Sequence, residues 1–178
     1  MQPAEPHFDH EPTLAGATVL LRPLRANDFE PLCAAASDPL IWEQHPDPLR
    51  YRRENFTIGF FEGALANGAL VVIDRATQGI IGSTRYYEWN PLAREVAIGY
   101  TFLARSHWGG LVNQEVKRLM LDHAFRFADT VWFHIGKDNL RSRRAIEKIG
   151  ARLDREALRP VNGVPQPYVY YRIDRPGG

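Results

Sequence analysis

Three β-rich runs follow one another in the middle of the chain, and they constrain the fold more than any other feature of the sequence. The first two, ALVVID at 69–74 and IIGSTRYYEW at 80–89, are separated by the turn-forming residues RATQG, and REVAIGYTFL at 94–103 follows Asn90-Pro91. Branched and aromatic side chains favour strands, and short polar or Pro-containing connections favour hairpins. The pattern predicts an antiparallel meander.

The segments on either side of the meander alternate between strands and helices. Before it, we predict a strand at 18–25 and helical segments at 28–44 and 52–68. Asn27 or Asp28 can cap the first of these helices. Asp38-Pro39 divides the first segment into two pieces, because proline disfavours helix in the residue before it. After the meander, the pattern predicts helices at 110–129 and 139–150, a strand at 130–135, and strands at 151–159 and 168–173 around a turn at 160–167.

This order of segments predicts the fold class. Helices on both faces of a mixed sheet bury the apolar sides of both kinds of element, which gives an α/β (α+β) fold with about six to seven strands and about four helices. A chain of 178 residues, 44% of them hydrophobic, is suited to one domain. We expect this domain at 16–175, after a flexible N-terminal arm at 1–15.

Charge and cysteine content narrow the function. The 22 basic and 21 acidic residues give a net charge of +1, which provides no global attraction to nucleic acid or to a membrane surface. Cys33 is the single cysteine, so an intramolecular disulfide and a Cys-rich zinc site are excluded, and a cytoplasmic location is expected. No apolar run approaches the roughly 20 residues that span a bilayer.

Gly109 and Gly110 lie between a predicted strand and a predicted helix. Adjacent glycines at such a position are often only turn residues. However, the free N–H groups and the dipole at a helix N-terminus also form a binding site for anions such as pyrophosphate. No Lys-Ser or Lys-Thr follows, and the preceding strand belongs to a meander, so the turn matches neither a P-loop nor a dinucleotide-binding motif.

Four blocks of sequence resemble the GNAT superfamily of acyl-CoA-dependent N-acetyltransferases, in the branch similar to the ribosomal-protein N-terminal acetyltransferases. They are LLRPLRANDFEPL at 20–32, IGYTFL at 98–103, WGGLVNQEVKRLMLDHAF at 108–125 and NLRSRRAIEKIGA at 139–151. The resemblance extends from about Thr18 to Ile173 and implies a central pair of parallel strands, IGYTFL and TVWFHI, that splay apart to admit acetyl-CoA. Within the third block, we interpret Glu115 and Lys117 as scaffold residues.

The resemblance also implies which residues bind acetyl-CoA. They are the backbone of Phe102 and Leu103, the turn and first helical residues Trp108, Gly109, Gly110, Val112 and Asn113, and the residues Asn139, Ser142 and Arg144 of the following helix, with Arg141 and Arg143 adding positive charge. Structural alternatives remain open: a core aromatic for Trp108, a helix brace for Asn113, an N-cap for Asn139, and a solvated helix face for the arginines.

The sequence departs from the family pattern at two places. Leu111 and Asn113 replace small residues of the usual turn, which the branch tolerates. Ala97 stands where related sequences often carry an acidic residue that acts as general base. An amine must lose a proton before it attacks a thioester, so we consider Glu95, on the same strand face as Ala97, and His134 as proton acceptors. Ser142 is a possible proton donor to the leaving thiolate, and positioning and backbone polarisation are mechanisms that need no side chain.

The function expected from this resemblance is transfer of an acetyl group from acetyl-CoA to a primary amine, either a protein N-terminus or a small molecule. We expect Trp42 to Tyr51 and the turn Pro160 to Pro167 to form the acceptor pocket. Ala97 motivates one alternative, an acyl-CoA-binding module with little turnover, and a structural or interaction protein is another. The protein is expected to be a monomer, or a homodimer that pairs through the closing hairpin.

Overall fold

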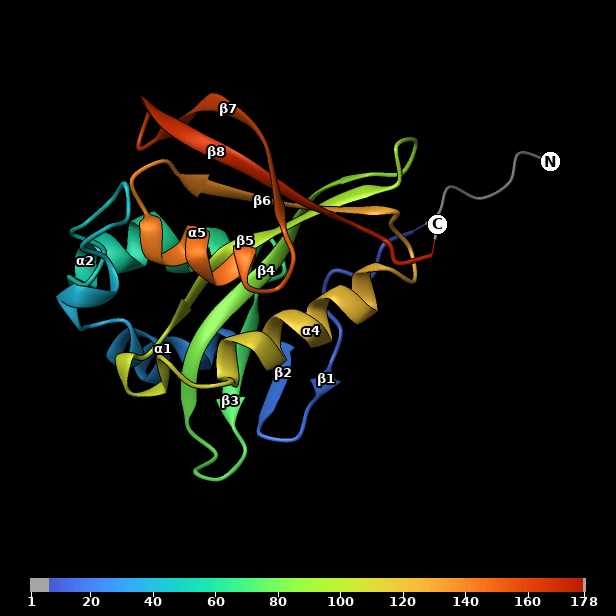
Figure 1. Cartoon of the computed structure of the whole chain (residues 1–178). Coiled ribbons are helices and arrows are strands. Elements are labelled where there is room, and N and C mark those ends of the chain that lie inside the picture. Colours follow the sequence, from blue (N-terminus) through green and yellow to red (C-terminus); the bar gives the residue numbers. More distant parts are fainter. Residues whose placement is uncertain (1–6, 178) are drawn as a thin grey trace.

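The meander forms the centre of an eight-stranded sheet in the computed structural model, which describes residues 7–177 (Figure 1). It consists of β3 (Leu70–Asp74), β4 (Ile80–Asn90) and β5 (Glu95–Leu103). Both pairings are antiparallel, as predicted. The central part of the fold is therefore confirmed.

The other strands extend the sheet on both sides, in the order β1-β2-β3-β4-β5-β6-β8-β7. Only β5 and β6 are parallel, so the sheet is mixed. The strand count is slightly above the predicted six to seven, because the two-residue β1 pairs with β2. The bounds are β1 (Leu14–Ala15), β2 (Val19–Pro23), β6 (Thr130–Gly136), β7 (Arg152–Val161) and β8 (Val164–Asp174).

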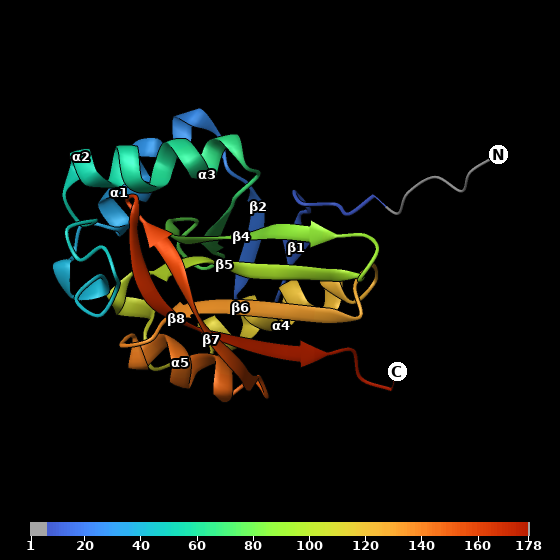
Figure 2. The same ribbon diagram turned by 90° about the horizontal axis from the view of Figure 1, so that it is seen from above.

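Helices cover both faces of the sheet. Figure 2 shows α1 to α3 on one face and α4 and α5 on the other. The π-helical turn η3 joins α2 and α3 into the single helix that the sequence predicts, and Asp38 caps the separate turn η2. The helices are α1 (Phe29–Ala35), α2 (Arg53–Phe56), α3 (Glu62–Ala66), α4 (Val112–Ala124) and α5 (Leu140–Glu147), and the short turns are η1 (Ala26–Asp28), η2 (Pro39–Ile41), η3 (Thr57–Phe61) and η4 (Arg105–His107).

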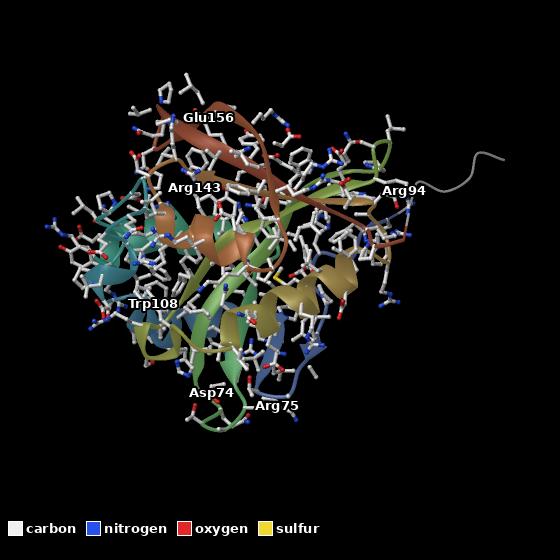
Figure 3. The ribbon with its side chains drawn as sticks, in the orientation of Figure 1. Asp74, Arg75, Arg94, Trp108, Arg143 and Glu156 are labelled. Carbon is white, nitrogen blue, oxygen red and sulfur yellow. The ribbon has the colours of Figure 1, made fainter. Side chains whose placement is uncertain are left out.

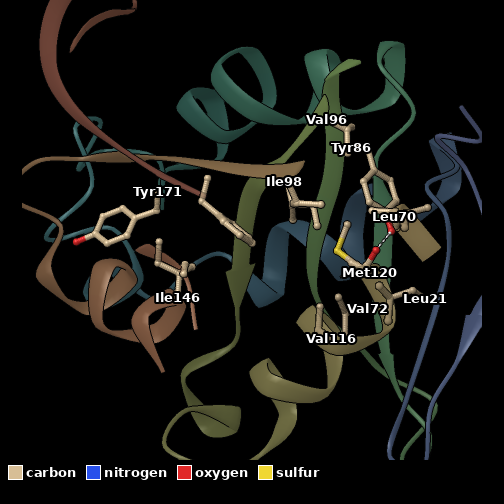
Figure 4. Close-up of a cluster of buried hydrophobic side chains, with 14 of the residues drawn as sticks. Leu21, Leu70, Val72, Tyr86, Val96, Ile98, Val116, Met120, Ile146 and Tyr171 are labelled. Carbon is tan, nitrogen blue, oxygen red and sulfur yellow. Dashed lines mark hydrogen bonds between the residues drawn. The ribbon is translucent and has the colours of Figure 1, made fainter. Parts of the chain in front are cut away.

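The sheet has a separate hydrophobic core on each face. In β3, Leu70 and Val72 belong to the core beneath α4 and α5, whereas Val71 and Ile73 belong to the core beneath α1 to α3. A continuous apolar run is what a strand buried on both faces requires. Figure 4 shows the first core, in which the buried Tyr86 hydroxyl donates a 2.8 Å hydrogen bond to the Met120 carbonyl of α4.

Residues 7–15, expected to belong to a flexible arm, pack against the domain, and residues 1–6 lie outside the described part. Phe8 is only 1% exposed, and its ring lies 5.0 Å from that of Tyr86 and 5.2 Å from that of Phe127. The imidazole of His123 is hydrogen-bonded to the Asp9 carbonyl at 2.8 Å. Burial of an aromatic side chain holds this segment in place.

Two local predictions were wrong. Of the two predicted caps, Asn27 and Asp28, Asp28 takes the N-cap position of α1 but makes no side-chain cap bond: its carboxylate accepts hydrogen bonds from the Arg25 N–H and from the Arg22 guanidinium, each at 2.8 Å. The closing turn is not the segment 160–167, because β7 and β8 pair up to Val161 and Val164. Asn162 and Gly163 alone make the turn, with φ of 49° and 78°, and such a two-residue turn matches the twist of a hairpin.

Candidate active site

A cleft opens where β5 and β6 diverge. The two strands pair only from Glu95 to Ala97 on β5 and from Thr130 to Trp132 on β6. Beyond these residues β5 continues beside β4, and β6 continues beside β8. The resulting cleft has a volume of about 740 Å³ and is lined by residues 98–103 of β5 and 133–136 of β6. This is the splayed parallel pair that the resemblance implied.

A β-bulge lies in β5 at the wall of the cleft. Ser83 of β4 pairs with Phe102 and Arg85 pairs with Gly99, so that Thr84 alone faces two residues of β5. Tyr100, one of the two, has a φ of 51°, which is unfavourable for a residue with a side chain. Such bulges redirect backbone and side-chain groups, and the strain is typical of functional sites.

The turn that leads into α4 forms another wall of the cleft. Gly109 has a φ of 72°, which explains why glycine is needed there, whereas Gly110 has neither a positive φ nor a neighbour within 4 Å of an added Cβ. Among the residues that the structure describes, no side chain caps the N-terminus of α4. Of the residues predicted at this turn, Trp108, Gly109, Gly110 and Asn113 line the cleft, and Val112 does not. An uncapped helix N-terminus beside two glycines is suited to binding an anion.

Trp108 links the cleft to the core of the protein. Its indole N–H donates a 3.0 Å hydrogen bond to the Leu103 carbonyl, and the Arg141 guanidinium lies 4.1 Å from its ring centre. Trp108 therefore has a bracing role, and it also lines the cleft. Figure 3 shows it on the loop that enters α4.

The residues predicted on α5 separate into two groups. Asn139, Ser142 and Arg144 line the cleft, and Asn139 also caps the helix, because its Oδ1 accepts a 3.2 Å hydrogen bond from the Ser142 N–H. Arg141 lines it as well, while its side chain donates to the Ile41 carbonyl at 2.8 Å. Arg143 does not line the cleft. Its guanidinium donates a 3.1 Å hydrogen bond to the Tyr171 hydroxyl instead.

The two proton acceptors considered from the sequence lie in different places. His134 lines the cleft, with its Nδ1 2.9 Å from the Tyr87 hydroxyl and its ring 4.1 Å from that of Tyr170. Burial lowers its pKa to about 4, so the imidazole is neutral at pH 7. Glu95 lies at the paired end of β5 and is not a lining residue. Ala97 is 1% exposed within that paired region.

Lys117, which we interpreted from the sequence as a scaffold residue, lines the cleft. The side chain is 4% exposed, its ammonium donates a 2.7 Å hydrogen bond to Thr101 Oγ1 on β5, and it lies 5.8 Å from the ring centre of Phe133 on β6. Burial lowers its pKa to about 7. The sequence feature that could have indicated its burial is its position three residues before the buried Met120, on the apolar face of the predicted helix.

Glu115, its neighbour in the motif, is the scaffold residue that we predicted. Its carboxylate accepts hydrogen bonds from the backbone of Ala17 and Thr18 and so ties α4 to the start of β2. Within residues 7–177, no group of three potential metal ligands comes together, and no helix is long and apolar enough to cross a membrane.

Comparison with known proteins supports the same fold. No curated protein sequence matches the chain. A GCN5-related N-acetyltransferase from Brucella melitensis has a similar structure, with a TM-score of 0.81, 20% identity, and coverage of 98% of this chain and 84% of the other. A Vibrio cholerae ribosomal-protein-serine acetyltransferase homologue has a TM-score of 0.73, 15% identity, and coverage of 92% and 97%. The microcin C7 self-immunity acetyltransferase MccE, solved with acetyl-CoA and AMP, has a TM-score of 0.74, 13% identity, and coverage of 90% and 94%.

The family itself is shown by sequence. The profile of the acetyltransferase (GNAT) domain matches residues 18–152, which include β2 to β6, α4 and α5. The splayed strands, the bulge and the uncapped helix lie within that range. The chain therefore belongs to the GNAT acetyltransferase family, and it is an acyltransferase that uses acetyl-CoA.

Proposed function

We propose that the protein transfers the acetyl group of acetyl-CoA directly to a primary amine, on a protein N-terminus or on a small molecule. The observation that carries the proposal is the divergence of β5 and β6 immediately beyond Ala97 and Trp132. It provides a cleft that reaches from the turn before α4 to the bulge at Tyr100. An elongated donor and an amine can therefore meet inside the sheet.

The cleft residues suit coenzyme A. Backbone N–H groups from Gly109 to Asn113 would bind its pyrophosphate, because the N-terminus of α4 has no competing side-chain cap. Arg144 and Lys148 also line the cleft and add positive charge. We assign the pantetheine arm to the backbone of Phe102 and Leu103 and to the side of Asn139 and Ser142. When bound, acetyl-CoA supplies the acetyl group as a thioester.

His134 is our proposed proton acceptor, because it lines the cleft and is unprotonated at pH 7, while burial makes it a weaker base than a free imidazole. A positioned base contributes about 10²-fold to 10⁴-fold to a rate. We expect His134→Gln to lower kcat by about 10²-fold and to leave the Kd for acetyl-CoA nearly unchanged. A normal kcat in this variant together with a large loss in Glu95→Gln would reassign the role to Glu95. Ser142 remains the proposed donor to the thiolate.

The function is tested by binding and by turnover. Isothermal titration should show acetyl-CoA binding, and thiol release should appear with a library of N-terminal peptides or of small amines. Gly110→Ala should weaken acetyl-CoA binding about tenfold without loss of stability, because only a close ligand meets the new methyl group. Gly63→Ala, in α3 and also without neighbours, is the matched control that should bind normally.

The outcomes separate the proposed function from its alternative. Absence of acetyl-CoA binding by a folded protein would refute the proposed acetyl transfer. Binding without thiol release across both libraries would favour the second candidate, an acyl-CoA-binding module, which the buried Ala97 in place of an acid supports.

A further inference from the structure

A buried arginine lines the cleft outside the segments assigned to the cofactor. Arg50, between η2 and α2, is 7% exposed, and its guanidinium lies 5.5 Å from the ring centre of Trp42 and 5.8 Å from that of Phe60. Its Nε is 3.4 Å from Asp47 Oδ2, an ion-pair distance at which Nε makes no hydrogen bond. A guanidinium has five N–H donors, so four of the Arg50 donors are on Nη1 and Nη2 and not on Nε.

The second polar neighbour of Arg50, His45, cannot accept a hydrogen bond from it. His45 Nε2 lies 3.5 Å from Arg50 Nη1. Burial, with the adjacent Arg50 charge, lowers the pKa of His45 to about 3, so the ring is neutral at pH 7. Its Nδ1 accepts a 2.9 Å hydrogen bond from the Asp47 N–H. A neutral imidazole that accepts through Nδ1 carries its proton on Nε2.

Two donors, His45 Nε2–H and Arg50 Nη1–H, therefore face each other 3.5 Å apart at the cleft, a contact that a shared acceptor would relieve. An oxyanion that accepts from both would complete the arrangement, and a guanidinium edge matches the two oxygens of a carboxylate. The neighbouring Asp47 balances the buried charge through the Nε edge and leaves the Nη edge for a ligand.

This arrangement lies beside the end of the cleft where β5 and β6 are apart. A Cβ placed on Gly136, the last residue of β6, would be 2.7 Å from Pro46 Cγ, so the segment that carries His45 and Arg50 packs directly on that strand. Tyr168 of β8, which pairs with Gly136, and Tyr100 at the bulge are the next ionisable neighbours of Arg50. Figure 2 shows the segment between α1 and α2 beside the ends of these strands.

We propose that Arg50 and His45 bind a carboxylate on the amine acceptor, so that the preferred substrate is an amine that also carries a carboxylate group. The inference rests on the proposed acetyl transfer and names its substrate class. The carboxylate belongs either to a free amino acid or to an acidic side chain near a peptide N-terminus. In both cases it anchors the acceptor beside Tyr100 and orients its amine in the cleft.

Matched pairs of acceptors test the proposal on the unaltered protein. Thiol release is measured with leucine against leucinamide, and with tripeptides that carry aspartate or asparagine at their second position. At least one pair should show a preference of about tenfold or more in kcat/KM for the carboxylate, the scale of a charged hydrogen bond. Phosphoethanolamine against ethanolamine is the third pair. Equal rates within all pairs, or a preference confined to the phosphate pair, would overturn the proposal while leaving acetyl transfer intact.

Variants then assign the preference to the residues. Arg50→Lys keeps a positive charge but loses the planar fork, so it should reduce the carboxylate preference to about threefold or less, mainly through KM. Arg52→Gln, an exposed change two residues away, is the control and should keep the full preference. Titration with acetyl-CoA verifies that each variant is folded. A full preference in a folded Arg50→Lys protein would exclude Arg50 as the anchor, and thiol release with none of the acceptors would instead count against the proposed function.

Discussion

Lys117 makes the stability of this protein depend on pH in a way that can be measured. Its amine is buried against Thr101 and Phe133, and burial is the only cause of its lowered pKa. We propose replacing it by methionine, which has a similar length, fits the cavity and carries no charge. The variant should be more stable than the natural protein at neutral pH.

The size of the effect follows from the pKa of Lys117, which falls from 10.5 to about 7 on folding. At about 1.4 kcal/mol per tenfold change in proton affinity, the buried charge costs about 5 kcal/mol when both states are protonated. Above pH 7 the folded protein loses the proton while the unfolded chain keeps it, so the cost declines. It is about 3 kcal/mol at pH 8 and about 1 kcal/mol at pH 10.

The assay is urea unfolding of the natural protein and of Lys117→Met at pH 6, 8 and 10. The gain in the free energy of unfolding should be largest at pH 6 and should shrink steadily toward pH 10, reduced throughout by about 1 kcal/mol for the lost hydrogen bond to Thr101. Lys148→Met, an exposed lysine at the same cleft, should change stability by about 0.5 kcal/mol or less at every pH. A gain that is constant with pH, or that grows as pH rises, would refute the reasoning.

Three further changes test the packing by urea unfolding at pH 7. Tyr86→Phe should cost about 1–2 kcal/mol, because it removes the buried hydrogen bond to the Met120 carbonyl; no loss would mean that this bond is unimportant. Phe8→Ala should cost about 3–5 kcal/mol if residues 7–15 are held as described, whereas a loose segment would make it neutral. Gly163→Ala should cost about 1–2 kcal/mol, since its φ of 78° disfavours a side chain, and an unchanged midpoint would contradict the two-residue turn formed by Asn162 and Gly163.

Several features of the fold could be predicted because they depend on residues close together in the sequence. The hydrophobic run of β3, the helix break at Asp38-Pro39 and the N-cap at Asn139 each arise from a local preference. The closing turn was predicted too long. The prolines near Asn162 suggested a loop, but Pro160 lies on the edge strand β7, and Pro165 and Pro167 lie on the part of β8 that extends beyond β6. A strand with one free edge tolerates a residue without an N–H group.

The candidate site was predictable only in part, because only some of its features depend on residues close together in the sequence. Gly109 and Gly110 indicated an anion site because a helix N-terminus has free N–H groups whatever surrounds it. Nothing local distinguishes Glu95 from His134, because the position at which β5 and β6 separate decides which of them reaches the cleft. Arg50 was part of a predicted acceptor segment, but whether its Nη1 has an acceptor depends on the tautomer of His45.

The sequence by itself determined the order of strands and helices, the family and the position of the turn before α4, since periodicity, turn residues and motif spacing are local properties. The tertiary structure decided the divergence of β5 and β6, the bulge at Tyr100 and the burial of Lys117. These depend on which distant segments exclude water from a group or leave its hydrogen bonds unpaired. Exclusion of water lowers the pKa of Lys117, and the packing of His45 against Arg50 sets the hydrogen-bond donors at that end of the cleft.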